Sequence, residues 1–162
     1  MDAFERLREA ETDEELAELR GLLEQTGYSG FRRLLQGFER MIKGFADGEE
    51  AAAKALVAKA RKAVPDPGAI SPAWDRVWDK LERMIDYKKK ALQAVPPEER
   101  EGEWQILIDN PYVNREVACY PGLTFEEASY IYARFRGELE NNEYIRLQKI
   151  VLHLTEFGGD PD

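Results

Sequence analysis

The sequence has few of the residues that most often carry catalysis or bind metals. Its 162 residues include one cysteine, Cys119, and one histidine, His153. A single cysteine excludes a disulfide within the chain and a metal site built from cysteines alone. Together with an acidic amino terminus that lacks the basic and then apolar order of a signal peptide, this predicts a cytoplasmic protein.

Several other motifs are absent. No apolar run approaches the roughly 20 residues of a membrane-spanning helix, so we expect no membrane partner. Neither the P-loop nor the dinucleotide-binding glycine fingerprint occurs. Most of the three serines and four threonines lie where helices are expected to begin or end, and none forms a recognisable nucleophile elbow. We therefore favour a non-catalytic protein and predict no metal and no cofactor.

Helical signals dominate what is present. Thr12-Asp13-Glu14-Glu15 and Thr124-Phe125-Glu126-Glu127 are capping boxes, each followed by apolar residues at helical spacing. Gly27 is placed to end a helix in the left-handed conformation. We predict a mainly α protein, a small bundle or orthogonal array of five to seven helices. The expected helices cover residues 3–10, 12–27, 30–45, 51–64, 72–95 and 124–139.

The chain reads as one helical domain over residues 1–157. Pro65-Asp66-Pro67-Gly68 marks a linker-like break at 65–71, and a sub-division into a helical part, 1–97, and a second part, 98–157, is the alternative. Residues 158–162, which hold two glycines and a proline, are expected to form a disordered tail.

Only one stretch predicts β structure. Trp104–Ile108 and Val113–Tyr120 are rich in β-branched or aromatic residues and flank the turn-forming Asp109–Tyr112. We expect a hairpin near residues 103–120, packed on the helices because a lone hairpin is marginal in water. After it, the apolar spacing of the last helix slips at Asn141-Asn142, where we expect a break, a kink or a change of packing partner. A new set then begins, comprising Tyr144, Leu147, Val151 and Leu154.

A seven-residue repeat places glycines and phenylalanines in neighbouring rows of one helix. Seven residues make two helical turns, so each row lies on one side of the helix. Glycine is unfavourable inside a helix, and a glycine row beside a phenylalanine row suggests the close approach of another helix. That helix could belong to this chain's own core or to a partner. As a hypothesis, the interaction surface comprises Gly30, Phe31, Gly37, Phe38, Gly44 and Phe45.

Charge is unevenly distributed over a net charge of −9. The net charge is −6 over residues 1–26, +4 over 27–64, +1 over 65–97 and −8 over 98–162. The acidic ends and basic middle can attract one another within one chain or between copies. In the helix expected at 72–95, acidic side chains form a stripe that reads as a solvated face rather than half of a metal site, because the helical Glu-x-x-His pattern is absent.

These observations favour a protein–protein interaction module, an adaptor or subunit that presents helical surfaces to a protein partner or to a second copy of itself. The second reading is a small-molecule-binding or enzymatic domain with a pocket between the hairpin and the C-terminal helices. The third, nucleic-acid binding through the basic middle, is the least favoured because the net charge opposes a polyanion. The pocket of the second reading would be lined by Tyr112, Cys119, Tyr120, Tyr130, Tyr132 and His153.

Overall fold

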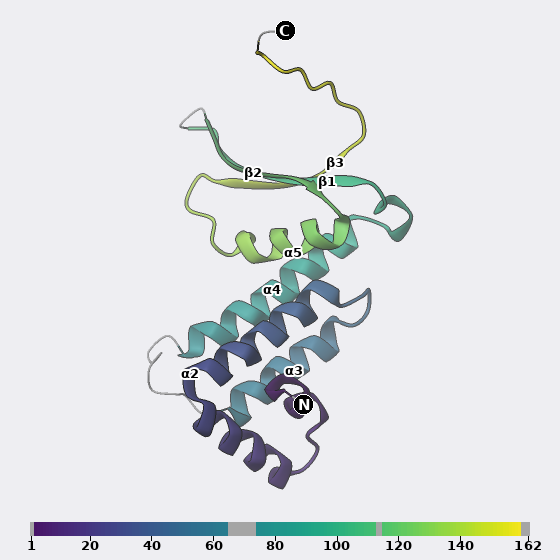
Figure 1. Cartoon of the computed structure of the whole chain (residues 1–162). Helices are drawn as coiled ribbons and strands as arrows, with labels where there is room; N and C mark the ends of the chain where they lie inside the picture. Colours follow the sequence, from purple (N-terminus) through teal and green to yellow (C-terminus); the bar gives the residue numbers. More distant parts are fainter. Residues whose placement is uncertain (1, 65–73, 113–114, 160–162) are drawn as a thin grey trace.

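The computed structural model describes residues 2–64, 74–112 and 115–159. The chain is mainly α, as the sequence predicts, with helices α1 to α4 at one end and a three-stranded sheet at the other (Figure 1). Helix α5 (Phe125–Arg136) lies between them, against α4 and one face of the sheet. No described helix covers the opposite face of the sheet. None of the described helices combines the length and the apolar character needed to cross a bilayer.

The amino-terminal helices begin where side chains accept hydrogen bonds from the first turn. In α1 (Ala3–Glu9), the Asp2 carboxylate accepts from the backbone N–H of Glu5 at 2.9 Å. In α2 (Asp13–Gly44), the Thr12 hydroxyl accepts from the backbone N–H of Glu15 at 3.1 Å. Gly27 has φ 63° and ψ −142°, a conformation that glycine adopts most readily. The two helices expected over 12–27 and 30–45 therefore join into one kinked helix.

Helices α3 (Glu50–Ala63) and α4 (Trp74–Ala94) are joined by ion pairs. Arg61 contacts Asp79 at 2.9 Å, and Lys54 contacts Asp86 at 2.9 Å. The acidic stripe of α4 thus faces basic side chains of α3 as well as solvent. Part of the basic middle of the sequence is compensated within the chain. The linker-like break expected at 65–71 lies outside the described residues.

The sheet contains the expected hairpin and a third strand that was not predicted. β1 (Glu103–Asn110) follows a 3₁₀ turn, η1 (Pro97–Glu99), and pairs antiparallel with β2 (Arg115–Leu123). On its other side, β1 pairs antiparallel with β3 (Tyr144–Ile150), giving the order β2-β1-β3.

The expectation that only the hairpin is β was wrong for residues 144–150. Tyr144 and Leu147 have helical spacing in sequence, yet they lie on opposite faces of β3, because Leu147 pairs with the inward-facing Ile106 and Tyr144 pairs with Asp109. Inward residues alternate with outward residues along a strand. Asn142 takes a φ of 71° before the strand, which is consistent with the break expected there.

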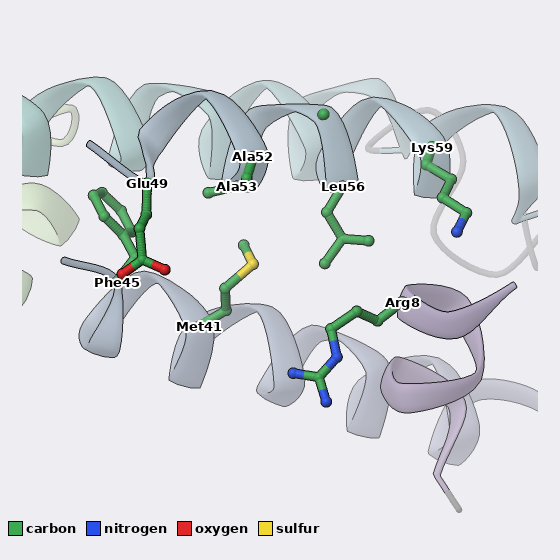
Figure 2. A pocket seen from close by; sticks show the side chains of 9 residues that line it. Arg8, Met41, Phe45, Glu49, Ala52, Ala53, Leu56 and Lys59 are labelled. Carbon is green, nitrogen blue, oxygen red and sulfur yellow. The ribbon is translucent and has the colours of Figure 1, made fainter. Parts of the chain in front are cut away.

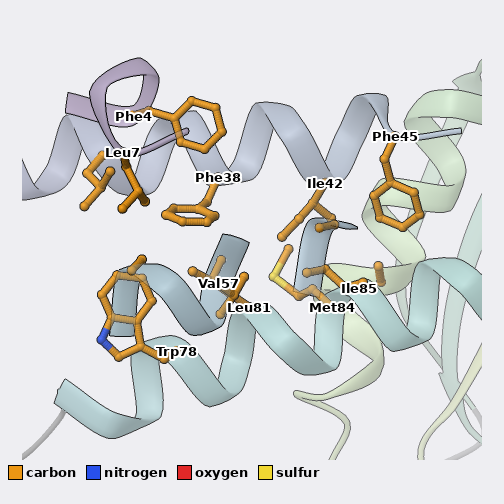
Figure 3. Close-up of a cluster of buried hydrophobic side chains, with 14 of the residues drawn as sticks. Phe4, Leu7, Phe38, Ile42, Phe45, Val57, Trp78, Leu81, Met84 and Ile85 are labelled. Atoms are coloured by element: carbon orange, nitrogen blue, oxygen red, sulfur yellow. The ribbon is translucent and has the colours of Figure 1, made fainter. Parts of the chain in front are cut away.

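The core runs from α1 through the helices to the inner face of the sheet. Phe38 lies at its centre, with edge-to-face ring contacts to Phe4 at 5.2 Å and to Trp78 at 5.9 Å between centroids (Figure 3). At the sheet end, the ring of Trp104 in β1 packs on the ring of Phe125 in α5, with 5.0 Å between the ring centroids. One continuous apolar cluster therefore links the two ends of the molecule.

Candidate functional site

The segment after β3 is the most unusual surface of the described chain. Residues 151–159 have no helix or strand, and Figure 1 shows them leaving the sheet on the side away from α1 to α4. We call Val151–Phe157 the C-terminal segment. The exposed fractions of its large apolar side chains are 85% for Val151, 94% for Leu152, 83% for Leu154 and 91% for Phe157. Exposed apolar groups of this size are typical of contact surfaces when they occur together.

The strand register explains why this segment is exposed. Ile150 pairs with Glu103, the first residue of β1, so the chain beyond Ile150 has passed the end of its partner strand. Within the described residues β3 is also an edge strand, with β1 on one side only. Unpaired backbone groups at such an edge can bind another extended chain.

The uncovered face of the sheet is mostly polar. Gln105 and Gln148 form a side-chain hydrogen bond of 2.9 Å across β1 and β3, and Arg146 contacts Asp109 at 3.5 Å. These pairs suit a face in contact with water, so the apolar character at this end of the molecule is concentrated in the C-terminal segment.

At the other end of the molecule, α1, α2 and α3 form an open hollow of about 480 Å³, which we call the α1–α3 groove (Figure 2). Met41 of α2 and Leu56 of α3 point toward one another across it. Ala52 and Ala55 of α3 also line it, and their small side chains leave the space open. A groove of this volume with mainly apolar walls is within the range of ligand and peptide sites.

Charged side chains mark the two ends of the α1–α3 groove. Arg8 extends into it from α1, and Lys59 lies nearby on α3, where its ammonium donates to the carbonyl of Ala10. Glu49 lies at the opposite end, and its carboxylate accepts from the backbone N–H of Ala46 at 2.8 Å. One end of the groove is thus cationic and the other anionic.

A second hollow, of about 390 Å³, adjoins the first. The two share Arg8, Met41, Phe45 and Glu49 as lining residues. It is bordered by Asp2 and Arg40, whose side chains approach to 3.8 Å, so its character is more ionic than that of the α1–α3 groove.

The structure buries most of the glycine–phenylalanine repeat inside this chain. Phe31, Phe38 and Phe45 are 3%, 0% and 7% exposed, which leaves them little area for a partner. Gly37 is covered by the ring of Phe4, Gly30 is buried, and Gly44 is exposed at the end of α2. At Gly37 the helix that approaches closely is α1 of the same chain, and Trp78 of α4 contacts the rings of Phe31 and Phe38.

The six residues of the predicted pocket do not converge. Cys119 and Tyr120 are neighbours in β2 and face opposite sides of the sheet. The ring of Tyr120 stacks on that of Phe135, with 5.4 Å between the ring centroids. Tyr112 is 77% exposed at the hairpin turn, and His153 lies in the C-terminal segment. The last two, Tyr130 and Tyr132, are half-buried on α5.

Burial raises the pKa of Tyr130 and of Tyr132 above the ordinary value of a phenol. The described residues contain no group of three or more histidine, cysteine, aspartate or glutamate side chains arranged to hold a metal ion.

Neither the exposed C-terminal segment nor the α1–α3 groove was among the surfaces predicted from the sequence. For the segment, the signal was the alternation of apolar and polar residues from Ile145 to Gln148, which indicates a strand and places the following residues beyond it. For the groove, the signal was the run of alanines on α3, whose side chains are too small to fill the space beside α2. Comparison with protein-family models, with curated protein sequences and with solved structures finds no match to this chain.

Proposed function

We propose that this chain is a non-catalytic protein–protein interaction module, an adaptor or subunit, and that the C-terminal segment is its contact surface. The single observation that carries the proposal is the near-complete exposure of four large apolar side chains within seven consecutive residues. The proposal moves the expected contact from a helical surface to this segment, because the helices pack their apolar faces against one another and against the sheet.

The energetics support a partner for this segment. Burying one leucine- or phenylalanine-sized side chain contributes about 1.5–3 kcal/mol, so four of them supply on the order of 6–12 kcal/mol before the entropic costs of association. An extended segment next to an edge strand also offers unpaired backbone groups, which peptide-binding surfaces commonly recognise together with alternate side chains. In this proposal the module acts in the cytoplasm, a compartment in which the exposed Cys119 side chain would stay reduced.

Photo-crosslinking in living cells of the source organism tests the proposal. A photoreactive phenylalanine analogue replaces Leu154, and a matched control carries it at Tyr28, an aromatic residue that is 58% exposed on α2. We expect a discrete crosslinked species from position 154 and none from position 28. Equal labelling at both positions, or none at position 154, would overturn the proposal.

A further inference from the structure

We propose that the α1–α3 groove of one copy of this chain binds the C-terminal segment of a second copy. The inference rests on the proposed function and names a second copy of this chain as the partner of the C-terminal segment. Each molecule then carries both halves of the contact, an exposed apolar segment at one end and an apolar groove at the other. Reciprocal exchange of segments closes a dimer, whereas one-way exchange builds a chain of molecules.

The dimensions of the groove suit a short extended peptide. The groove runs along one face of α3 from Glu49 to Lys59, and ten residues of helix rise about 15 Å. An extended chain covers about 3.3 Å per residue, so about five residues span that length. Leu152–Glu156 provides five residues in a region without regular secondary structure.

The chemistry of the two surfaces is complementary. Leu152 and Leu154 are separated by one residue, so in an extended chain they point to the same side and can both contact the apolar walls at Met41 and Leu56. Glu156 continues that side of the segment and would meet Arg8 at the cationic end. Among the described residues no carboxylate pairs with Arg8, whose guanidinium lies 5.9 Å from the Phe4 ring centroid.

The charge at the other end of the groove sets the direction of the bound segment. Glu49 would repel Glu156, so the segment lies with its Leu152 end toward Glu49 and its Glu156 end toward Arg8 and Lys59. The opposite direction would bring the two glutamates together and leave the cations facing leucine.

The geometry favours a second copy over the segment's own groove. The segment leaves β3 on the side of the sheet that faces away from the helices, while α1 lies at the far end of the helical part (Figure 1). Within one molecule the segment would have to reverse its direction and pass the sheet and α5. Between two molecules it needs only to remain extended.

Native mass spectrometry of two complementary variants tests the inference. The segment variant is L152S/L154S, and the groove variant is L56E, a change at a partly exposed position. A51E is the matched control, because Ala51 is exposed on α3 and does not line the groove. We expect the unaltered protein and A51E to form oligomers at micromolar concentration. We expect each of the other two variants alone to be a monomer in the native mass spectrum and to keep the circular dichroism spectrum of the unaltered protein.

Mixing the two variants gives the sharpest result. The segment variant retains a groove and the groove variant retains a segment, so an equimolar mixture should form a 1:1 heterodimer and nothing larger. Persistent oligomers in either variant alone, a monomeric unaltered protein at 100 μM, or a mixture without heterodimer would overturn the inference. If the crosslink at position 154 then joins a different protein, the proposed function stands without a second copy as its partner.

Peptide binding gives an independent measurement on the full chain. A fluorescent peptide of residues 150–162 is titrated into the segment variant. The altered segment of that variant is not expected to compete with the peptide for the groove. We expect saturable binding of the peptide to the segment variant. The affinity should fall at least tenfold when the segment variant also carries the L56E substitution, and at least threefold when the peptide carries E156K. Equal affinity for the chain with and without L56E would overturn the assignment of the groove.

Discussion

At the scale of single residues, the repeat of glycine and phenylalanine shows how one missing side chain decides a helix contact. A Cβ added at Gly37 would lie 2.4 Å from Cγ of Phe4, whereas at Gly44 it would meet nothing within 4 Å. Helix α1 therefore approaches α2 where Gly37 has no side chain. Phe38, the next residue of the repeat, packs its ring edge-to-face on Phe4, with 5.2 Å between the ring centroids.

The matched pair G37A and G44A measures the importance of that approach. We expect G37A to lower the free energy of unfolding by about 1–3 kcal/mol, because the methyl group forces the Phe4 ring out of its position. G44A should leave the stability unchanged or raise it by less than about 1 kcal/mol, since alanine favours helix. Urea denaturation of both variants checks this. Equal effects of the two substitutions would contradict a close contact at Gly37.

Lys88 is the second residue whose surroundings determine its behaviour. It is 2% exposed, and its ammonium donates to the carbonyls of Ile42, Lys43 and Phe45 at 2.7, 2.7 and 2.9 Å. These carbonyls lie where α2 ends, and without a donor they would lack helical partners. A buried charge thus holds the end of α2 against α4.

Burial lowers the pKa of Lys88 from 10.5 to about 8. The neighbouring charges act in both directions, since Glu126, Glu49 and Asp47 raise this pKa and Arg100 lowers it. Below pH 8 the lysine is protonated in both the folded and the unfolded state, so the cost of burying the charge is fully present. Between pH 8 and 10.5 the unfolded chain binds more protons than the folded one, and the free energy of unfolding should therefore rise with pH.

Comparison with K88M isolates this titration. The difference in unfolding free energy, unaltered protein minus K88M, is expected to increase from pH 7 to pH 10 in urea denaturation experiments. At pH 7 K88M should lose on the order of 2 kcal/mol, because buried carbonyls lose a charged donor. A difference that shrinks with pH would show that the three carbonyls hold the proton more strongly than burial repels it.

At the scale of elements, the helices predicted from the sequence are found where a local signal fixes their first or last residue. The capping box at Thr124 is present with both hydrogen bonds, 3.0 and 3.1 Å, and α5 begins at the following residue. Gly27, whose φ is positive at 63°, also ends a helical stretch, and the next stretch of α2 begins directly after this kink. Such signals need only neighbouring residues, so one sequence is enough to reveal them.

Signals that depend on distant partners were misread. The four apolar residues expected at helical spacing, Tyr144, Leu147, Val151 and Leu154, proved to be two residues of β3 and two of the C-terminal segment. Pairing with β1, more than 30 residues earlier, decides the conformation of β3. The α1–α3 groove was not predicted, because the alanines of α3 leave it open only where α3 packs beside α2, and that packing is not visible in the spacing along one helix.

The two faces of β1 give a prediction for the sheet as an element. Ile106 is fully buried toward α5, while Leu107 lies on the uncovered face. I106A is expected to lower the free energy of unfolding by about 2–4 kcal/mol through loss of core contacts, and L107A by less than about 1.5 kcal/mol. Thermal or urea unfolding of the two variants checks the register. A larger loss of unfolding free energy in L107A than in I106A would contradict the register, because the core would then lie on the Leu107 face of β1.

At the scale of the whole molecule, Arg100 connects the helical part to the sheet part. Its guanidinium contacts the Asp47 carboxylate through two hydrogen bonds of 2.6 and 2.9 Å and donates to the carbonyls of Val95 and Leu92 at the end of α4. It also lies 5.1 Å from the ring centroid of Phe125 in α5. The pairing with Asp47 raises the pKa of Arg100 and lowers that of Asp47, which keeps both charged at physiological pH.

The strand order has a consequence for how the chain reaches its final structure. The central strand, β1, is followed at once by β2, but its other neighbour, β3, is made only after α5. During synthesis β1 therefore leaves the ribosome with one edge unpaired. About 35 more residues must be made before β3 can pair with that edge. Because pairing of distant segments is slow, docking of β3 is expected to be the late step of folding, and during that interval the newly made chain is most exposed to misassembly with its neighbours.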